Sequence, residues 1–170
     1  MLKTLESTGQ ELEDMTTQQV FDFVGEYLLS QEKRSVVKNC FTDIDECTYD
    51  LGGVNRCAVG ICLTEEQLLF TRQNDLHSVS VCHLIEHQDE CDFTGLCVHE
   101  DVLADLQNIH DCNFDRKISK EYLTVELTRA AELHKLTTDN LSHLFAKTCY
   151  IYTEKSESRD QICYGITSYN

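Results

Sequence analysis

Proline is absent from the 170-residue chain, so its turns must be built from glycine, asparagine, aspartate and helix-capping residues. Long apolar runs are missing as well. Because a membrane-spanning helix needs about 20 predominantly apolar residues, the sequence predicts none. Met1–Glu6 lacks the basic and apolar segments of a signal peptide, which argues against secretion. We therefore expect a cytoplasmic protein that does not act in a membrane.

Basic residues are scarce. Lys and Arg number 14 against 30 Asp and Glu, and the formal net charge is −16. Direct binding to a nucleic-acid backbone needs a basic footprint, so this composition argues against it. The hydrophobic share of 41% is typical of a globular chain, and the length fits one ordinary domain.

The acidic residues are concentrated in one stretch of the chain. Residues 73–115 contain ten Asp and Glu and no Lys or Arg. A compact domain must place such a stretch partly on its surface, where it steers association with a basic partner. The expected contact residues are Glu86, Asp89, Glu90, Asp92, Glu100, Asp101 and Asp105. The leading hypothesis is an acidic protein that inhibits or regulates another protein. In the plainer alternative, the charge only keeps the chain soluble.

Local patterns predict an α+β fold, a mostly helical single domain with one or two small β-hairpins. Thr16 and Gln19 make a capping box, and Gly52-Gly53 is a turn signal. Residues 57–63 are an apolar run of buried-strand length, although a helix start is also compatible. Helices are expected over 16–31, from Thr64, over 74–87, over 100–110, from Ser119 to His134 and over 141–145. We expect residues 1–14 to be a polar extension, 15–147 the domain and 148–170 a C-terminal hairpin.

One ordered set of motifs resembles a known family. The set comprises Arg56-Cys57-Ala58-Val59-Gly60 after the Gly-Gly turn, then Thr64-Glu65-Glu66, then Leu103-x-x-Leu106-Gln107-x-x-His110-Asp111. It is similar to a family of small uncharacterised proteins of tailed phages and bacteria, over about residues 15–136. The family's second cysteine falls at Ile61 here. The resemblance implies a phage or bacterial cytoplasmic setting. Combined with the acidic charge, that setting leads to the hypothesis that the partner is a host protein with a basic surface, either a defence factor or a nucleic-acid-handling enzyme. The resemblance implies no reaction.

Ten cysteines leave the thiol chemistry open. Reduced, buried thiols are favoured over a disulfide framework, since nothing indicates an oxidising compartment. One alternative function is a thiol-dependent hydrolase or transferase, with Cys57 as nucleophile, His110 as base and Asp111 as the orienting acid. The competing interpretation is a buried small residue before a close-packing Gly60, with His110 as a core histidine.

A second alternative is an interaction module whose fold is stabilised by a bound zinc ion. No cofactor is expected in the leading hypothesis, but Cys91, Cys97 and His99 supply soft ligands within nine residues. Their spacing lacks the paired Cys-x2-Cys of zinc ribbons and fingers. A pocket for a phosphate-bearing signalling molecule is less compatible with the net charge of the chain. Such a pocket would need Arg34, Arg56 and Arg72 to converge.

Overall fold

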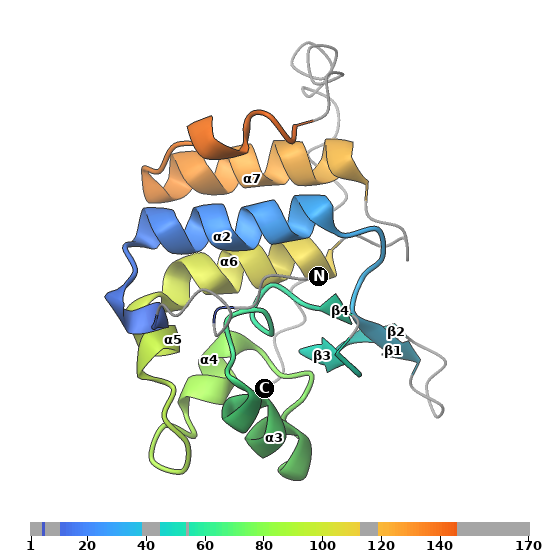
Figure 1. Ribbon diagram of the computed structural model, residues 1–170, viewed down its shortest axis with the longest axis vertical. Coiled ribbons are helices and arrows are strands. Elements are labelled where there is room, and N and C mark those ends of the chain that lie inside the picture. The colour runs from blue at the N-terminus through green and yellow to red at the C-terminus, as the bar shows by residue number, and fades with distance from the viewer. Residues whose placement is uncertain (1–4, 6–10, 39–44, 54, 113–118, 146–170) are drawn as a thin grey trace, which may run out of the picture.

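The computed structural model describes residues 5, 11–38, 45–53, 55–112 and 119–145. It confirms the α+β class: helices dominate, and the described strands form two small antiparallel pairs. Three longer helices lie side by side at one end of the molecule, and three shorter helices and the strands form the other end (Figure 1). No helix in these ranges is long and apolar enough to cross a membrane.

The first long helix, α2, covers Thr17–Ser30 and confirms the predicted start. The Thr16 side chain accepts a hydrogen bond from the Gln19 backbone, and the Gln19 side chain accepts one from Thr16 N–H at 2.8 Å. This reciprocal cap satisfies two backbone donors that a helix start otherwise leaves unpaired. The buried face of α2 carries Val20, Phe21, Val24, Tyr27, Leu28 and Leu29.

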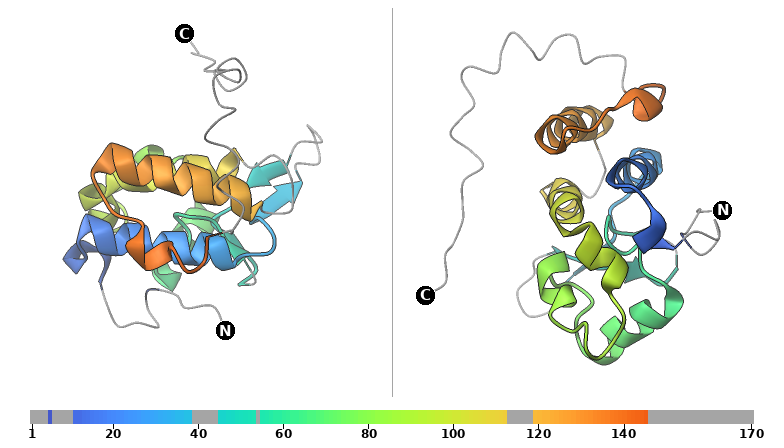
Figure 2. Two further views of the ribbon diagram at one scale, coloured as in Figure 1. Left: turned by 90° about the horizontal axis from the view of Figure 1, so that it is seen from above. Right: turned by 90° about the vertical axis from the view of Figure 1, so that its left-hand side faces the viewer.

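Helices α6 (Glu100–Asp111) and α7 (Lys120–His134) pack on α2 and on each other, and the three helices form a bundle (Figure 2). Both helices were predicted. The apolar face of α6 is buried and carries Val102, Leu103, Leu106 and Ile109. Ser119 caps α7 by accepting from Tyr122 N–H at 3.2 Å, and Lys135 ends it in a left-handed conformation. The 3-10 turn η2 (Asp139–Leu141) then packs Leu141 against α2.

Helices α3 (Glu65–Gln73), α4 (Val81–Ile85) and α5 (Thr94–Val98) form the other end of the molecule. Thr64 and Gln67 make a second capping box at α3. The 3-10 turn η1 (Leu12–Asp14) packs on α5, so this part of the predicted extension contacts the domain. The predicted C-terminal hairpin over 148–170 lies outside the described residues.

The helix predicted over 74–87 is wrong over most of its length, since α4 begins only at Val81. Asp75 adopts a left-handed conformation with φ of 56°, which stops α3. The carbonyls of His77 and Val79 then accept hydrogen bonds from Tyr49, through its N–H at 2.9 Å and its hydroxyl at 2.7 Å. Tertiary contacts to Tyr49 therefore replace the helical hydrogen bonds of this segment.

The strands form two hairpin-like pairs. Strand β1 (Val36–Lys38) pairs with β2 (Asp45–Cys47), with Val36 opposite Cys47. Strand β3 (Asp50–Leu51) pairs with β4 (Asn55–Arg56) across the predicted turn, where Gly52 and Gly53 have φ of 60° and 76°. Only glycine adopts this backbone conformation without steric cost.

Residues 57–63 are a set of tight turns at the centre of the core, so the expected strand is wrong. Ile61 N–H bonds to the Cys57 carbonyl at 3.1 Å, and Cys62 N–H to the Val59 carbonyl at 2.9 Å. The whole segment is nevertheless buried. The segment is apolar because it is buried between the helices and strands. Hydrogen bonds within its own turns satisfy the backbone N–H and C=O groups that a strand would have paired with a neighbouring strand.

Candidate functional site

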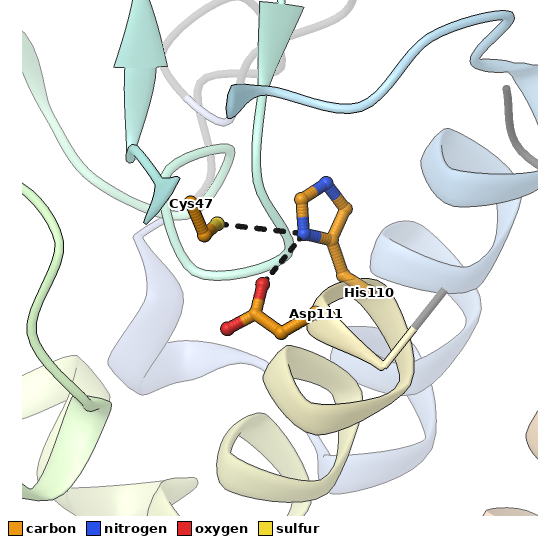
Figure 3. A group of neighbouring side chains, drawn as sticks. All are labelled: Cys47, His110 and Asp111. Atoms are coloured by element: carbon orange, nitrogen blue, oxygen red, sulfur yellow. Dashed lines mark hydrogen bonds and ion pairs between the residues drawn. The ribbon is translucent and has the colours of Figure 1, made fainter. Parts of the chain in front are cut away.

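The first candidate site joins the end of α6 to strand β2. Nδ1 of His110 lies 3.5 Å from Sγ of Cys47 and 2.9 Å from Oδ1 of Asp111 (Figure 3). His110 is 1% exposed, and the Asp111 side chain is 34% exposed. Among the described residues, these are the only three His, Cys, Asp or Glu side chains whose ligand atoms all lie within 4.8 Å of one another.

The fold positions each member of this cluster. His110 and Asp111 are the last two residues of α6. Nη2 of Arg34 donates a hydrogen bond to the backbone carbonyl of Asp111 at 2.9 Å. Cys47 ends β2, whose register with β1 is fixed by three residue pairs. Two residues further on, the buried Tyr49 anchors the chain to the segment before α4.

The structure corrects the predicted catalytic set. His110 and Asp111 do meet, but the thiol that contacts His110 is Cys47. Cys57 is buried and lies close enough to Cys47 to raise the pKa of its thiol. Nothing in the sequence distinguishes Cys47 from the other cysteines, because it lies 63 residues before His110 and reaches it only through the tertiary fold.

The geometry differs from that of a nucleophilic triad. In a triad, the nucleophile contacts one imidazole nitrogen and the carboxylate orients the ring through the other. Here the thiol and the carboxylate both contact Nδ1. The other nitrogen, Nε2, is buried and has no hydrogen-bond partner among the residues described. The three side chains are therefore not arranged for proton transfer from Cys47 to an imidazole ring that Asp111 orients.

The environment of Cys47 also opposes thiolate formation. The hydrogen bond with Cys57, burial and the negative charge of Asp111 all raise the pKa of the Cys47 thiol far above its usual range. An activated cysteine shows the opposite shift, because a neighbouring cation or helix N-terminus stabilises its thiolate.

We expect Cys47 in the metal-free protein to react with iodoacetamide at pH 7.5 at least about tenfold more slowly than a small free thiol. A pKa raised by one unit already lowers the thiolate population about tenfold. Peptide mapping by mass spectrometry after timed labelling gives the rate for each cysteine, and the exposed Cys82 and Cys97 serve as internal references. Labelling of Cys47 faster than a free thiol would restore the thiol-hydrolase hypothesis.

The second candidate site is a groove of about 780 Å³ between η1, α3 and the segment that leads into α5. Its apolar surface comes from Leu12, Leu69, Phe70 and Leu96. Leu69 is 51% exposed, so it presents a large apolar side chain to a ligand in the groove. Its lining combines apolar and polar side chains, and its size is typical of ligand or peptide sites.

Carboxylates surround this apolar surface. The groove is lined by Glu11, Glu13, Glu66, Glu90 and Asp92, and no Lys or Arg from the described ranges joins them. Hydrogen bonds from the backbone and hydroxyl of Thr94 and from the Gln88 amide hold the pKa of Asp92 below its usual value. Asp92 therefore keeps its negative charge in mildly acidic solution.

The negative charge of the groove raises the pKa of a cysteine that lines it. Burial, followed by the carboxylates of Glu66 and Asp92, raises the pKa of Cys91 above its usual value. Both carboxylates lie close enough to disfavour a further negative charge at the sulfur. The groove is therefore a negative site for charged ligands as well as an apolar one.

The predicted partner-binding residues divide among four places. Glu90 and Asp92 line the groove, with Glu90 paired to His87 at 2.8 Å. Glu100 and Asp101 lie in the first turn of α6, where they raise the pKa of the Cys82 thiol. Asp105 bonds to His134 of α7 at 2.8 Å and lines a separate hollow between α6 and α7. Glu86 and Asp89 are exposed after the end of α4, and Glu86 pairs with His83.

Sequence reasoning found two acids of the groove and missed three. Glu11 and Glu13 lie in the segment expected to be a polar extension, and Glu66 was named only as part of the Thr64-Glu65-Glu66 motif. They join Glu90 and Asp92 because η1 packs on α5 and because the Gln67 amide of α3 donates to the Asp92 carbonyl.

The predicted zinc ligands are not gathered into a cluster. Nε2 of His99 contacts the Leu12 carbonyl at 3.1 Å, and Sγ of Cys97 contacts the Gln88 amide oxygen at 3.9 Å. Cys91 lines the groove. In the part of the chain that the structure describes, only the Cys47 cluster brings three ligand atoms together.

The arginines do not form an anion pocket. Arg56 and Arg72 do converge, but each pairs with Asp50 and Glu65, which cancel their charge. Arg34 bonds to the end of α6 instead. A phosphate-bearing ligand would have to displace the carboxylates of Asp50 and Glu65 from Arg56 and Arg72.

Comparison of the chain with models of known protein families, with curated proteins and with solved structures finds no match. The two sites must therefore be interpreted from their own chemistry.

Proposed function

We propose that this protein is a binding module that holds a basic, amphipathic segment of a partner protein in the groove between η1, α3 and α5. One observation carries this proposal: an apolar surface that includes the half-exposed Leu69 is surrounded by five carboxylates. An amphipathic helix with apolar residues on one face and Lys or Arg beside them matches both features. The net charge of −16 adds long-range attraction to such a partner.

The consequence for the partner is occlusion of the bound segment. Basic amphipathic surfaces are common where proteins handle nucleic acids, so a partner held here would lose access to its own ligand. If the resemblance to phage and bacterial proteins holds, the partner is a host protein, either a defence factor or a nucleic-acid-handling enzyme, and binding takes place in the bacterial cytoplasm. Catalysis is not part of the proposal, because both Cys47 and Asp111 contact one nitrogen of His110.

A capture experiment with two charge-reversal variants tests the proposal. Glu66→Lys with Glu90→Lys changes two exposed groove acids. Glu132→Lys with Asp139→Lys makes the same change of net charge on α7 and η2, at the opposite end of the molecule from α3 (Figure 1). Each tagged protein is incubated with bacterial lysate and washed at about 0.1 M and then about 0.5 M salt, across which charge screening becomes much stronger.

We expect wild type and the α7–η2 variant to retain the same protein, and the groove variant to lose it at both salts. Two reversed charges at a docking site cost several kcal/mol in like-charge contact, which corresponds to a loss of at least about tenfold in affinity. Circular dichroism and the urea midpoint of each variant control for folding. Equal retention by the two variants would contradict the proposal.

A further inference from the structure

The Cys47 cluster brings together three kinds of side chain that bind metal ions. Three different electron-pair donors, a sulfur, an imidazole nitrogen and a carboxylate oxygen, face one another within 4.8 Å. They come from the end of β2 and the end of α6, which are 63 residues apart in the chain. The dashed contacts in Figure 3 converge on one atom, Nδ1 of His110.

Neither neutral tautomer of His110 satisfies these contacts. If Nδ1 carries the proton, it donates to Asp111 or Cys47, and the lone pair of the buried Nε2 has no partner among the described residues. If Nε2 carries the proton, the lone pair of Nδ1 faces the carboxylate oxygen at 2.9 Å, which is repulsive. A cation placed between the three donors removes the repulsion between Nδ1 and the carboxylate, because each of the three atoms then directs a lone pair at the cation. The proton is then on Nε2, which has no partner among the described residues in this state either.

We propose that Cys47, His110 and Asp111 form a binding site for a zinc-class metal ion, with Cys47 Sγ, His110 Nδ1 and an Asp111 carboxylate oxygen as ligands. Zinc accepts thiolate, imidazole and carboxylate ligands together, at about 2.3 Å from sulfur and about 2.0–2.2 Å from nitrogen and oxygen. A tetrahedral arrangement with those bond lengths puts the sulfur and nitrogen about 3.6 Å apart. The observed separation is 3.5 Å.

The carboxylate needs a small adjustment. The Asp111 oxygen lies 2.9 Å from Nδ1 of His110. The nitrogen and oxygen ligands of a tetrahedral zinc ion are about 0.5 Å further apart than this. The Asp111 side chain is 34% exposed, so a rotation of the carboxylate reaches the longer distance without disturbing the core. His110, by contrast, is 1% exposed, so the surrounding core holds its ring in place.

The surroundings favour a divalent cation. His110 and Asp111 lie in the last turn of α6, the negative end of its dipole. A thiolate from Cys47 and the Asp111 carboxylate would balance the two positive charges of the ion. Arg34 donates to the backbone carbonyl of Asp111, and the pairing of β1 with β2 fixes Cys47 opposite Val36. These contacts position the end of α6 and the end of β2.

Cobalt titration tests the proposal with protein prepared without a histidine tag and freed of metal by a chelator. Co²⁺ substitutes for zinc and reports its ligands through thiolate-to-cobalt charge-transfer bands and the intense visible bands of tetrahedral coordination. We expect one equivalent of Co²⁺ to produce both sets of bands, and Zn²⁺ to displace it. Cys47→Ser should abolish the charge-transfer band. Cys82→Ser, a change at an exposed cysteine of α4, should leave it intact.

A second variant covers the case in which Cys47→Ser disturbs the fold. Asp111→Asn alters a partly exposed ligand and removes one negative charge. It should weaken Co²⁺ binding about 10- to 100-fold or more and reduce the zinc-dependent rise in melting temperature, because stabilisation follows the affinity for the folded state. Absence of tetrahedral cobalt bands at stoichiometric metal would overturn the assignment. So would bands that survive in Cys47→Ser, or an affinity that Asp111→Asn leaves unchanged.

Discussion

Gly60→Ala is expected to prevent stable folding. A Cβ at position 60 would lie 1.8 Å from the carbonyl oxygen of Tyr49 and 2.6 Å from its carbonyl carbon. Both atoms belong to the backbone, so no side-chain rotation relieves the clash. The carbonyl of Tyr49 also accepts a hydrogen bond from Cys57 N–H at 3.3 Å, which ties the two segments together. We expect a loss of about 4 kcal/mol or more, a large part of the stability of an ordinary domain.

Gly52→Asn is the matched control for this change. Gly52 has φ of 60°, and a Cβ there would meet nothing within 4 Å. Asparagine tolerates the left-handed region, so its cost should stay within about 1 kcal/mol. Urea unfolding followed by circular dichroism compares the two variants with wild type. A Gly60→Ala protein as stable as Gly52→Asn would mean that the turns of residues 57–63 do not pack on Tyr49 as described.

Arg56→Met is expected to destabilise the protein by about 3–5 kcal/mol, because it removes one partner of a buried ion pair. The Arg56 side chain is 9% exposed, and that of Asp50 is 7% exposed. Nε of Arg56 lies 3.8 Å from Asp50, and Nη2 pairs with Glu65. After the substitution, Asp50 keeps Gly53 N–H at 2.8 Å and Arg72 at 4.0 Å, so a buried carboxylate loses its main counter-charge.

Arg129→Met is the matched control, since its side chain is 63% exposed and pairs with Glu126 one helical turn away. Exposed pairs of this kind contribute about 0.3–0.5 kcal/mol. Asp50→Asn added to Arg56→Met should recover part of the lost stability by removing the unpaired charge. If Arg56→Met costs no more than Arg129→Met, the Arg56–Asp50 contact is not a structural pair.

Local signals in the sequence predicted the helix starts well. Thr16, Thr64 and Ser119 all cap helices where expected, because a cap depends on residues three positions apart. Failures came where distant contacts override local preference. Residues 74–80 bond to Tyr49 instead of forming a helix, and residues 57–63 are apolar because they are central, not because they are a strand.

The sites were only partly predictable for the same reason. His110 and Asp111 could be paired from their order at the end of one helix, but Cys47 could not, since its contact with them depends on how the β1–β2 pair meets α6. Likewise, the stretch free of Lys and Arg indicated a negative surface. Its groove depends on η1 and α3, which lie outside that stretch and whose positions follow from packing.

The most direct test of the binding function uses the protein's own cysteines as a footprint. Cys91 lines the groove, whereas the exposed Cys82 on α4 does not. Maleimide labelling of both is timed with and without the captured partner. With the partner at about ten times its Kd, labelling of Cys91 should slow about tenfold while that of Cys82 is unchanged. Unchanged labelling of Cys91 in the saturated complex would place the partner elsewhere and contradict the account.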